Sequence, residues 1–458
     1  MTTKSVKTSH FRTIRNNSDA RALCGRRELF FDNYLTAELH GVTLKVHEPH
    51  AQAPEPSQPT GHYMTMLQGT DKIRCYCRKS FFEFTGAHPR FAVKPGFVND
   101  YTAYGESTSG VKFLEPPLFL YDCGVPNVMR CLHWSVGNFA PFYDENPACP
   151  PEERFKATAG DANPLCGGGL HGYVSANGYE FRELPGVLIR PRKSWGYCFD
   201  SQNVAFWSEA EGCYVCYFRL NITPDGRKLR TICKATSSDF RHWGNFTPQE
   251  VNLENEHLYV SQLTPYPRAR HIYIGTPTRY SEERGSATDI ALIFSRAGGP
   301  FARPQLDSWI RPGHGADAWG NRYNYLARGI VQTGPAEMSL YHCHSQVRYT
   351  LRLDGFTSLH TGYATGEWLS RPLAYEGGSL EFNVATGVYG GFRVELQTAD
   401  GKPVPGYTLA DAEEFYGDAI EYHPCWRGGK TTLPFRPGEA FRLLCQFREA
   451  DLYSFQIH

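Results

Sequence analysis

Two carboxylates near the middle of the chain, Asp200 and Glu256, are separated by 56 residues. The polar residues Ser201, Gln202 and Asn203 follow Asp200 directly, ahead of an apolar strand pattern in which they fit poorly unless they face a ligand. A carboxyl group that donates a proton and a second one that acts as base or nucleophile can together cleave a covalent bond. We therefore expect Asp200 to be catalytic; the alternative is that it caps a turn.

Glu256 and Asp144 are the candidates for the partner of Asp200. Glu256 lies in the phrase ENEHLYVSQ, which is either a catalytic loop or a solvated acidic one. As a general acid it needs a raised pKa, which burial would provide. Asp144 follows a predicted strand, and its alternative role is an Asx turn ahead of Pro147.

A repeat supplies the scaffold for these side chains. A strand ending in a small or hydroxyl residue, a polar turn and an aromatic residue recur at steps of 68, 61, 59 and 58 residues, counted from Ser107 to Ser175, Thr236, Ser295 and Leu353. A repeat of this length made of strands and turns holds about four strands, which is one propeller blade. Five copies predict a five-bladed propeller.

Outside the repeat, the strand pattern continues without long amphipathic helices. We expect an all-β chain in which residues 1–50 form an N-terminal segment leading into the propeller, residues 51–358 form the propeller, and residues 359–458 form a β-sandwich. Ligands of a propeller meet the innermost strand of each blade at its axis. We therefore expect the catalytic and binding residues on or next to those strands.

Composition excludes several classes of partner. Lys plus Arg equals Asp plus Glu, at 47 each, so neither nucleic acid nor an anionic membrane is an expected partner. No apolar run approaches a membrane span, and the first residues lack an apolar signal core. The fourteen Cys lie largely among apolar strand residues, which favours a reducing, cytoplasmic compartment, or a periplasmic one if a leader has been removed. No metal or other cofactor is expected.

Several phrases make the chain similar to a known group of proteins. It resembles bacterial glycosyl hydrolases of the family-32-like and family-43-like type, which are five-bladed propellers followed by a β-sandwich. The phrases that carry the resemblance are NFAPF at 138–142, FDSQNV at 199–204, YPRA at 266–269, WGNR at 319–322 and YTLRLDGF at 349–356.

This resemblance implies a carbohydrate substrate and a glycoside hydrolase. Family 32 enzymes use a nucleophile in the first blade, an Asp in an Arg-Asp-Pro phrase and a Glu as acid. Here the first inner strand, GHYMTMLQ, contains no Asp, while Asp200 occupies the place of the second carboxylate. The step from Asp200 to Glu256 fits the family's step from Asp to Glu, and Asp144 is the stand-in for the missing carboxylate.

Polar residues at corresponding points of the blades would bind sugar hydroxyls. The expected substrate-binding residues are His62, Asn138, Arg190, Gln202, Asn203, Gln262, Trp319, Asn321 and Arg322. Trp319 is a candidate stacking face. Arg190 opens a run of three cations, in IRPRKSW, that could bind an anionic group.

Two alternatives to hydrolysis remain open. A phosphate-dependent glycoside phosphorylase works with one carboxylate and a cluster of cations, for which Arg190, Arg192, Lys193 and Arg322 are available. A non-catalytic glycan-binding propeller needs neither acid nor nucleophile, which fits the absence of an Asp from the first inner strand.

Overall fold

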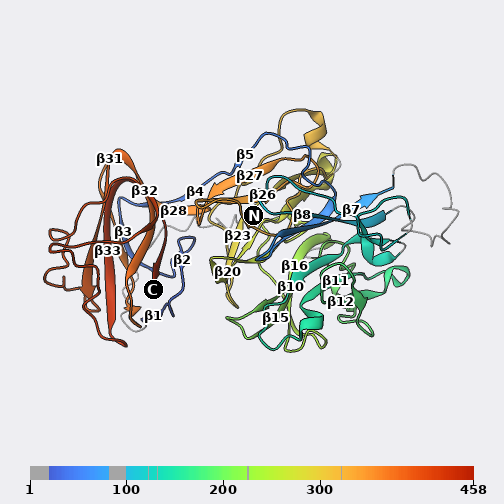
Figure 1. Ribbon diagram of the computed structural model, residues 1–458, viewed down its shortest axis with the longest axis horizontal. Helices are drawn as coiled ribbons and strands as arrows, with labels where there is room; N and C mark the ends of the chain where they lie inside the picture. The colour runs from blue at the N-terminus through green and yellow to red at the C-terminus, as the bar shows by residue number, and fades with distance from the viewer. Residues whose placement is uncertain (1–19, 82–99, 122, 132, 224–225, 321) are drawn as a thin grey trace. The chain divides into compact units, whose positions relative to one another are not determined.

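The computed structural model of the protein describes residues 20–81, 100–121, 123–131, 133–223, 226–320 and 322–458. The chain divides into two compact units, one spanning residues 48–351 and the other combining residues up to 47 with residues 352–458. All regular structure in the described residues is strand or short 3₁₀ turn (Figure 1), so the predicted all-β class is confirmed. No described helix is long and apolar enough to span a membrane.

The larger unit is the five-bladed propeller, with one four-stranded sheet per blade. The first blade contains β6 (His62–Gln68), β7 (Ile73–Ser80), β8 (Asp100–Ser107) and β9 (Val128–Cys131). The second contains β10 (Ala140–Tyr143), β11 (Phe155–Asp161), β12 (Gly169–Ser175) and β13 (Arg182–Glu183). The third contains β14 (Val204–Ser208), β15 (Cys213–Ile222), β16 (Leu229–Ser237) and β17 (Gly244–Pro248). The fourth contains β19 (Thr264–Tyr266), β20 (Ala269–Gly275), β23 (Ile293–Arg296) and β24 (Phe301–Ala302).

The fifth blade closes the ring. It contains β25 (Val331–Gln332), β26 (Glu337–Tyr341), β27 (Arg348–Arg352) and, as its outermost strand, β5 (His50–Ala51). Ala51 pairs with Tyr349 in antiparallel register, so residues that precede the first blade complete the last one. The two ends of the propeller are thereby joined by backbone hydrogen bonds.

The fourth blade carries an inserted sheet that the sequence pattern did not indicate. The phrases RHIYIGTPTRY (270–280) and DIALIFSRA (289–297) each have the sequence pattern of one strand. Instead they separate into β20 with β21 (Thr278–Ser281) and β22 (Ala287–Ile290) with β23, and β21 and β22 join β18 (His257–Leu258) in a three-stranded sheet. Pro277 explains the first break, because it lacks the N–H that a continuing ladder needs.

The sequence repeat predicts that the fifth blade starts near Trp319, and the structure corrects this start. Residues 316–319 form the 3₁₀ turn η7 (Ala316–Trp319), and the innermost strand β25 begins only at Val331. The residues between them lead from the inserted sheet to the axis of the propeller.

The second unit is a β-sandwich whose strands all belong to one hydrogen-bonded sheet. Two long strands, β31 (Leu380–Thr398) and β33 (Ala440–Ile457), run side by side (Figure 1). The remaining strands are β1 (Arg21–Ala22), β2 (Glu28–Leu29), β3 (Thr36–His40), β4 (Thr43–Val46), β28 (Thr357–Thr361), β29 (Gly366–Ser370), β30 (Leu373–Ala374) and β32 (Asp418–Tyr422). The N-terminal segment thus supplies four strands to this unit.

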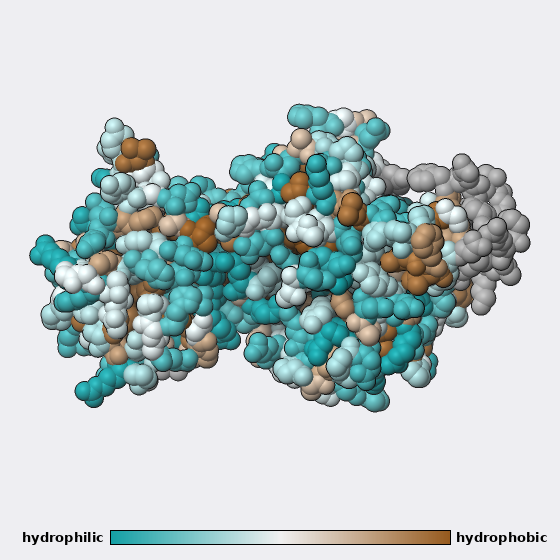
Figure 2. Space-filling view, viewed as in Figure 1, coloured by the Kyte–Doolittle hydropathy of each residue, from teal (hydrophilic) through white to brown (hydrophobic). Residues whose placement is uncertain are grey.

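Apolar residues are gathered inside each unit. Neighbouring blades pack through rings such as Phe206 of the third blade and Tyr273 of the fourth, whose centroids are 4.9 Å apart. In the sandwich, Trp368, Phe382 and Phe441 are fully buried in one core. On the face shown in Figure 2, hydrophilic residues predominate and hydrophobic residues form only small patches, as expected when the apolar side chains fill cores.

Candidate active site at the propeller axis

The axis of the propeller is marked by a buried arginine, Arg328, which is 3% exposed. Its guanidinium donates to the carbonyl oxygens of Pro141 (3.0 Å), Ala205 (3.1 Å) and Leu263 (3.3 Å), and its backbone N–H donates to that of Met64 (2.9 Å). These four acceptors belong to blades two, three, four and one. Burial lowers the pKa of Arg328 to about 10. The side chain of Arg328 therefore bonds the innermost segments of blades two, three and four, and its backbone bonds that of blade one.

A layer of amides closes the axis next to Arg328. Gln202 donates to the carbonyl of Tyr63 (3.0 Å) and to the hydroxyl of Thr65 (2.7 Å). Gln262 donates to the side-chain oxygen of Gln202 (2.9 Å) and to the carbonyl of Leu326 (2.8 Å). Both glutamines, which had been predicted to bind substrate, are buried and connect blades.

Asn138 and Asn203 also serve the scaffold. Asn138 donates to the carbonyls of Gly160, Phe199 and Ser201, and Asn203 donates to the last two of these. Their amides are thus committed to the loop that carries Asp200. We assign them to holding that loop in place and not to contacting a ligand.

A group of side chains lies next to these buried amides. We call it the axial cluster, and its members are Tyr63, Asp200, Arg219, Tyr259 and Tyr325. Asp200 is 49% exposed and pairs with the buried Arg219 at 2.8 Å. The Arg219 guanidinium stacks on the ring of Tyr259, 4.9 Å from its centroid, and Tyr259 packs edge-on against Tyr325. Burial raises the pKa of Tyr63 and of Tyr325 far above the usual range, so both hydroxyls stay protonated.

The backbone around the cluster is strained. Tyr63, Phe199, Gln262 and Arg322 have φ values of 48°, 66°, 50° and 58°. The left-handed region costs a residue other than glycine about 1–2 kcal/mol. Strain of this kind is retained where the surrounding structure enforces it, often at functional sites. Tyr63, Phe199 and Gln262 lie just ahead of, or at the start of, innermost strands, so this end of the axis holds strained backbone in three blades.

A second carboxylate, Asp161, belongs to the same end of the propeller. It is the last residue of β11, and β11 runs antiparallel to β10, so Asp161 lies beyond the start of the innermost strand. It accepts hydrogen bonds from the Tyr197 hydroxyl (2.6 Å) and the Asn163 backbone N–H (2.7 Å). These hydrogen bonds lower the pKa of Asp161. Burial, the largest effect, and the nearby charge of Asp200 raise it, and the net shift is upward.

His62 borders the cluster together with a histidine of the fifth blade. Its Nδ1 lies 3.0 Å from Nε2 of His344, and the backbone N–H of His344 donates to Nδ1 of His342 (3.2 Å). Burial, with the nearby His344, lowers the pKa of His62 to about 4 and that of His342 to about 3. No group of three or more potential ligands able to hold a metal ion occurs among the described residues.

The lowered pKa values of the exposed His62 and of the buried His342 predict a pH dependence of stability. Between their ordinary pKa of 6.5 and about pH 4, His62 and His342 bind a proton in the unfolded chain but not in the folded one. The unfolded state then carries more protons, so the free energy of unfolding decreases as the pH falls through this window. His342→Gln should make the decrease in melting temperature between pH 6.5 and 4 smaller. The exposed His314→Gln variant is the control, and equal decreases in both variants would contradict the assignment.

The other two predicted carboxylates lie elsewhere. Glu256 accepts from Arg303 (2.6 Å) and from the Leu253 backbone N–H (3.0 Å), and it shares no contact with Asp200 among the described residues. Asp144 is fully buried past the opposite end of β10, where it binds Lys156 (2.6 Å) and the Tyr214 hydroxyl (2.7 Å). Both carboxylates are engaged in contacts within the fold.

The remaining predicted residues have separate positions. Arg322 is exposed, and its guanidinium lies 3.5 Å from the hydroxyl of Tyr259 at the axial cluster. Arg190 is exposed beside the short bridge between Leu170 and Ile189. Trp319 lines a cavity on the inserted sheet. Asn321 lies outside the described residues.

The sequence contained a signal for the residues that were missed. An aromatic residue stands shortly before or at the start of the innermost strand in four blades, as Tyr63, Phe139, Tyr259 and Tyr325. Asp161 was harder to find, because it closes a second strand, and only the antiparallel pairing brings that end of the strand to the axis.

The sequence matches no protein-family model and no curated protein. Among solved structures, the chain is similar to a family 43 arabinoxylan arabinofuranohydrolase from Bacillus subtilis in complex with cellotetraose, at 13% identity and a TM-score of 0.41 over 88% of this chain and 96% of that one. It is also similar to a β-1,2-mannobiose phosphorylase from Listeria innocua, at 10% identity and a TM-score of 0.45 over 67% and 93%. At these values the likeness carries no conclusion about chemistry, and we base the function on the side chains.

Proposed function

We propose that the protein is an enzyme that cleaves glycosidic bonds at the axial cluster. The observation that carries the proposal is the pair Asp161 and Asp200, two carboxylates in contrasting environments at one end of the axis. Asp161 has a raised pKa, whereas Asp200 is ion-paired and half exposed. Glycoside cleavage requires such a division between an acid and a second carboxylate.

The roles follow from these environments. Asp161 holds a proton more readily than an ordinary carboxylic acid and gives it to the oxygen of the leaving sugar. Asp200, kept in position by Arg219, acts on the anomeric carbon directly or through water. Tyr63 and Tyr325 supply hydroxyls that stay protonated, and the hydroxyl and ring of Tyr259 lie beside them. Groups of this kind bind sugar hydroxyls and sugar C–H surfaces.

A screen of aryl glycosides and natural oligosaccharides, with products followed by NMR, tests this proposal. We expect release of a reducing sugar, and the anomer formed first reports whether Asp200 attacks carbon or activates water. Absence of turnover on all substrates, combined with sugar binding, would favour a glycan-binding protein instead.

Transfer to phosphate is the second candidate, and the exposed Arg322 beside Tyr259 favours it. A guanidinium at the mouth of the site can bind phosphate in the place of the attacking water. Turnover that requires added inorganic phosphate and yields a sugar phosphate would establish this reaction. Turnover in phosphate-free buffer would exclude it.

A further inference from the structure

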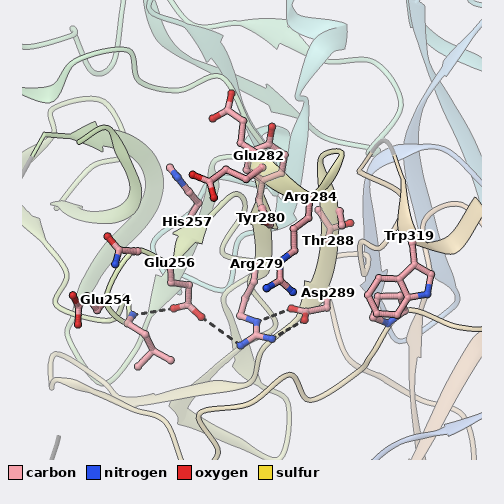
Figure 3. A pocket seen from close by; sticks show the side chains of 16 residues that line it. Glu254, Glu256, His257, Arg279, Tyr280, Glu282, Arg284, Thr288, Asp289 and Trp319 are labelled. Atoms are coloured by element: carbon pink, nitrogen blue, oxygen red, sulfur yellow. Dashed lines mark hydrogen bonds and ion pairs between the residues drawn. The ribbon is translucent and has the colours of Figure 1, made fainter. Parts of the chain in front are cut away.

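The inserted sheet of the fourth blade carries a cavity that the proposed reaction does not use. Its volume is about 740 Å³, and residues of β18, β21, β22 and the turn η7 line it. Figure 3 shows Arg279 at its centre, paired with Asp289 on one side and Glu256 on the other, with Trp319 beyond Asp289. This size suits more than one sugar unit better than it suits a single ion or water.

The cavity borders the axial cluster. Tyr280, one of its lining residues, packs against Tyr259 with ring centroids 5.5 Å apart. The guanidinium of Arg230 stacks on both rings, 4.7 Å from Tyr280 and 5.7 Å from Tyr259. Both rings are buried, so the cavity lies next to the axial cluster across the Tyr259–Tyr280 pair. A sugar chain that reaches both sites has to pass over this pair.

Trp319 gives the cavity an aromatic face. The side chain is 54% exposed, and its indole N–H donates to the carbonyl of Gly313 at 3.1 Å. The hydrogen bond fixes the ring while leaving apolar surface uncovered. An exposed but fixed aromatic plane packs against the C–H face of a sugar at little cost in conformational entropy.

The charges of the lining select against anions. The lining contains five carboxylates, those of Glu254, Glu256, Glu282, Glu283 and Asp289, and two guanidiniums, those of Arg279 and Arg284. Arg279 is engaged by Asp289, with both nitrogen–oxygen distances at 2.6 Å, so it is not available to a ligand anion. Arg303 and Arg230 pair with Glu256 and Glu282 from outside the lining, so carboxylates exceed guanidiniums by one. This small excess of negative charge disfavours uronate, sulfate and phosphate groups.

We propose that this cavity binds further units of a neutral oligosaccharide whose reacting unit sits at the axial cluster. This inference rests on the proposed function for the identity of the reacting unit. The substrate is then an uncharged chain of several sugars. Trp319 stacks on one of these sugars, and the acidic side chains of the lining disfavour anionic sugars. The run of cations at Arg190 does not contribute to this compartment.

Direct binding tests the proposal without requiring turnover. Xylotetraose, mannotetraose and arabinotetraose are titrated as neutral probes, and tetragalacturonate as the anionic one, by calorimetry. We expect at least one neutral probe to bind the wild type, Trp319→Ala to weaken its binding about tenfold, and tetragalacturonate not to bind. The variant Phe119→Ala, which removes a more exposed aromatic ring on the first blade, should leave the affinity unchanged.

Charge removal supplies the second arm. Glu282→Gln combined with Glu283→Gln should let tetragalacturonate bind while neutral binding is retained. Unchanged neutral affinity in Trp319→Ala, or failure of every neutral probe to bind the wild type, would overturn the inference. Binding that depends on Trp319 in a protein without turnover would uphold the cavity and reject the proposed reaction, which separates the two claims.

Discussion

Asp161→Asn should lower kcat on a natural oligosaccharide by about 10²–10⁴, the loss expected when a general acid is removed. The loss should be much smaller on an aryl glycoside with a good leaving group, because such a group departs without protonation. Asparagine keeps the oxygen that accepts from Tyr197 and Asn163, so the fold should be unaffected. Steady-state kinetics on both kinds of substrate measure the difference.

The pattern across variants distinguishes acid catalysis from a structural effect. Asp200→Asn should lose activity on both kinds of substrate, since the second carboxylate is needed whatever the leaving group. Asp71→Asn, at an exposed turn between β6 and β7, is the matched control and should behave as the wild type. If Asp161→Asn loses activity equally on both substrates, Asp161 is not the acid.

Much of the fold could be predicted because the strands and turns of each blade follow one another closely in the sequence. Alternating strands and polar turns repeat at a steady interval, and the five copies correspond to the five four-stranded blades. The inserted sheet was missed because β20 and β21, like β22 and β23, are separated by only two residues in sequence. The use of β5 as the last strand of the fifth blade is a long-range pairing that no local pattern encodes.

The candidate site was predicted only in part, for a physical reason. Sequence position identifies which residues lie near the axis, but not whether they point toward ligand or toward another blade. Gln202, Gln262 and Asn138 were placed at the axis, yet their amides donate to backbone carbonyls of the propeller. Buried polar groups are nearly always hydrogen-bonded. Polar residues at a propeller axis therefore often bond to other blades and not to a ligand.

Arg328→Met should destabilise the propeller by about 4 kcal/mol or more. The substitution leaves the carbonyls of Pro141, Ala205 and Leu263 buried without their donor, and each unsatisfied group costs about 1–3 kcal/mol. Methionine fills a similar length of space, so the cost reflects lost hydrogen bonds more than a cavity. Urea denaturation, comparing midpoints and slopes with the wild type, measures the change.

The variant Arg328→Lys tests whether the positive charge of Arg328 or the shape of its guanidinium stabilises the propeller. Lysine keeps the cation but presents a single ammonium, which cannot match the planar fork that reaches three carbonyls at once, so we expect an intermediate loss of stability. Arg190→Met, on the exposed surface, should change little. A loss for Arg328→Met as small as that for Arg190→Met would contradict the axial role. Gln202 and Gln262 bond to the same innermost segments as Arg328 and lie next to the axial cluster. If Arg328 holds these segments together, Arg328→Lys should also weaken sugar binding at the axial cluster.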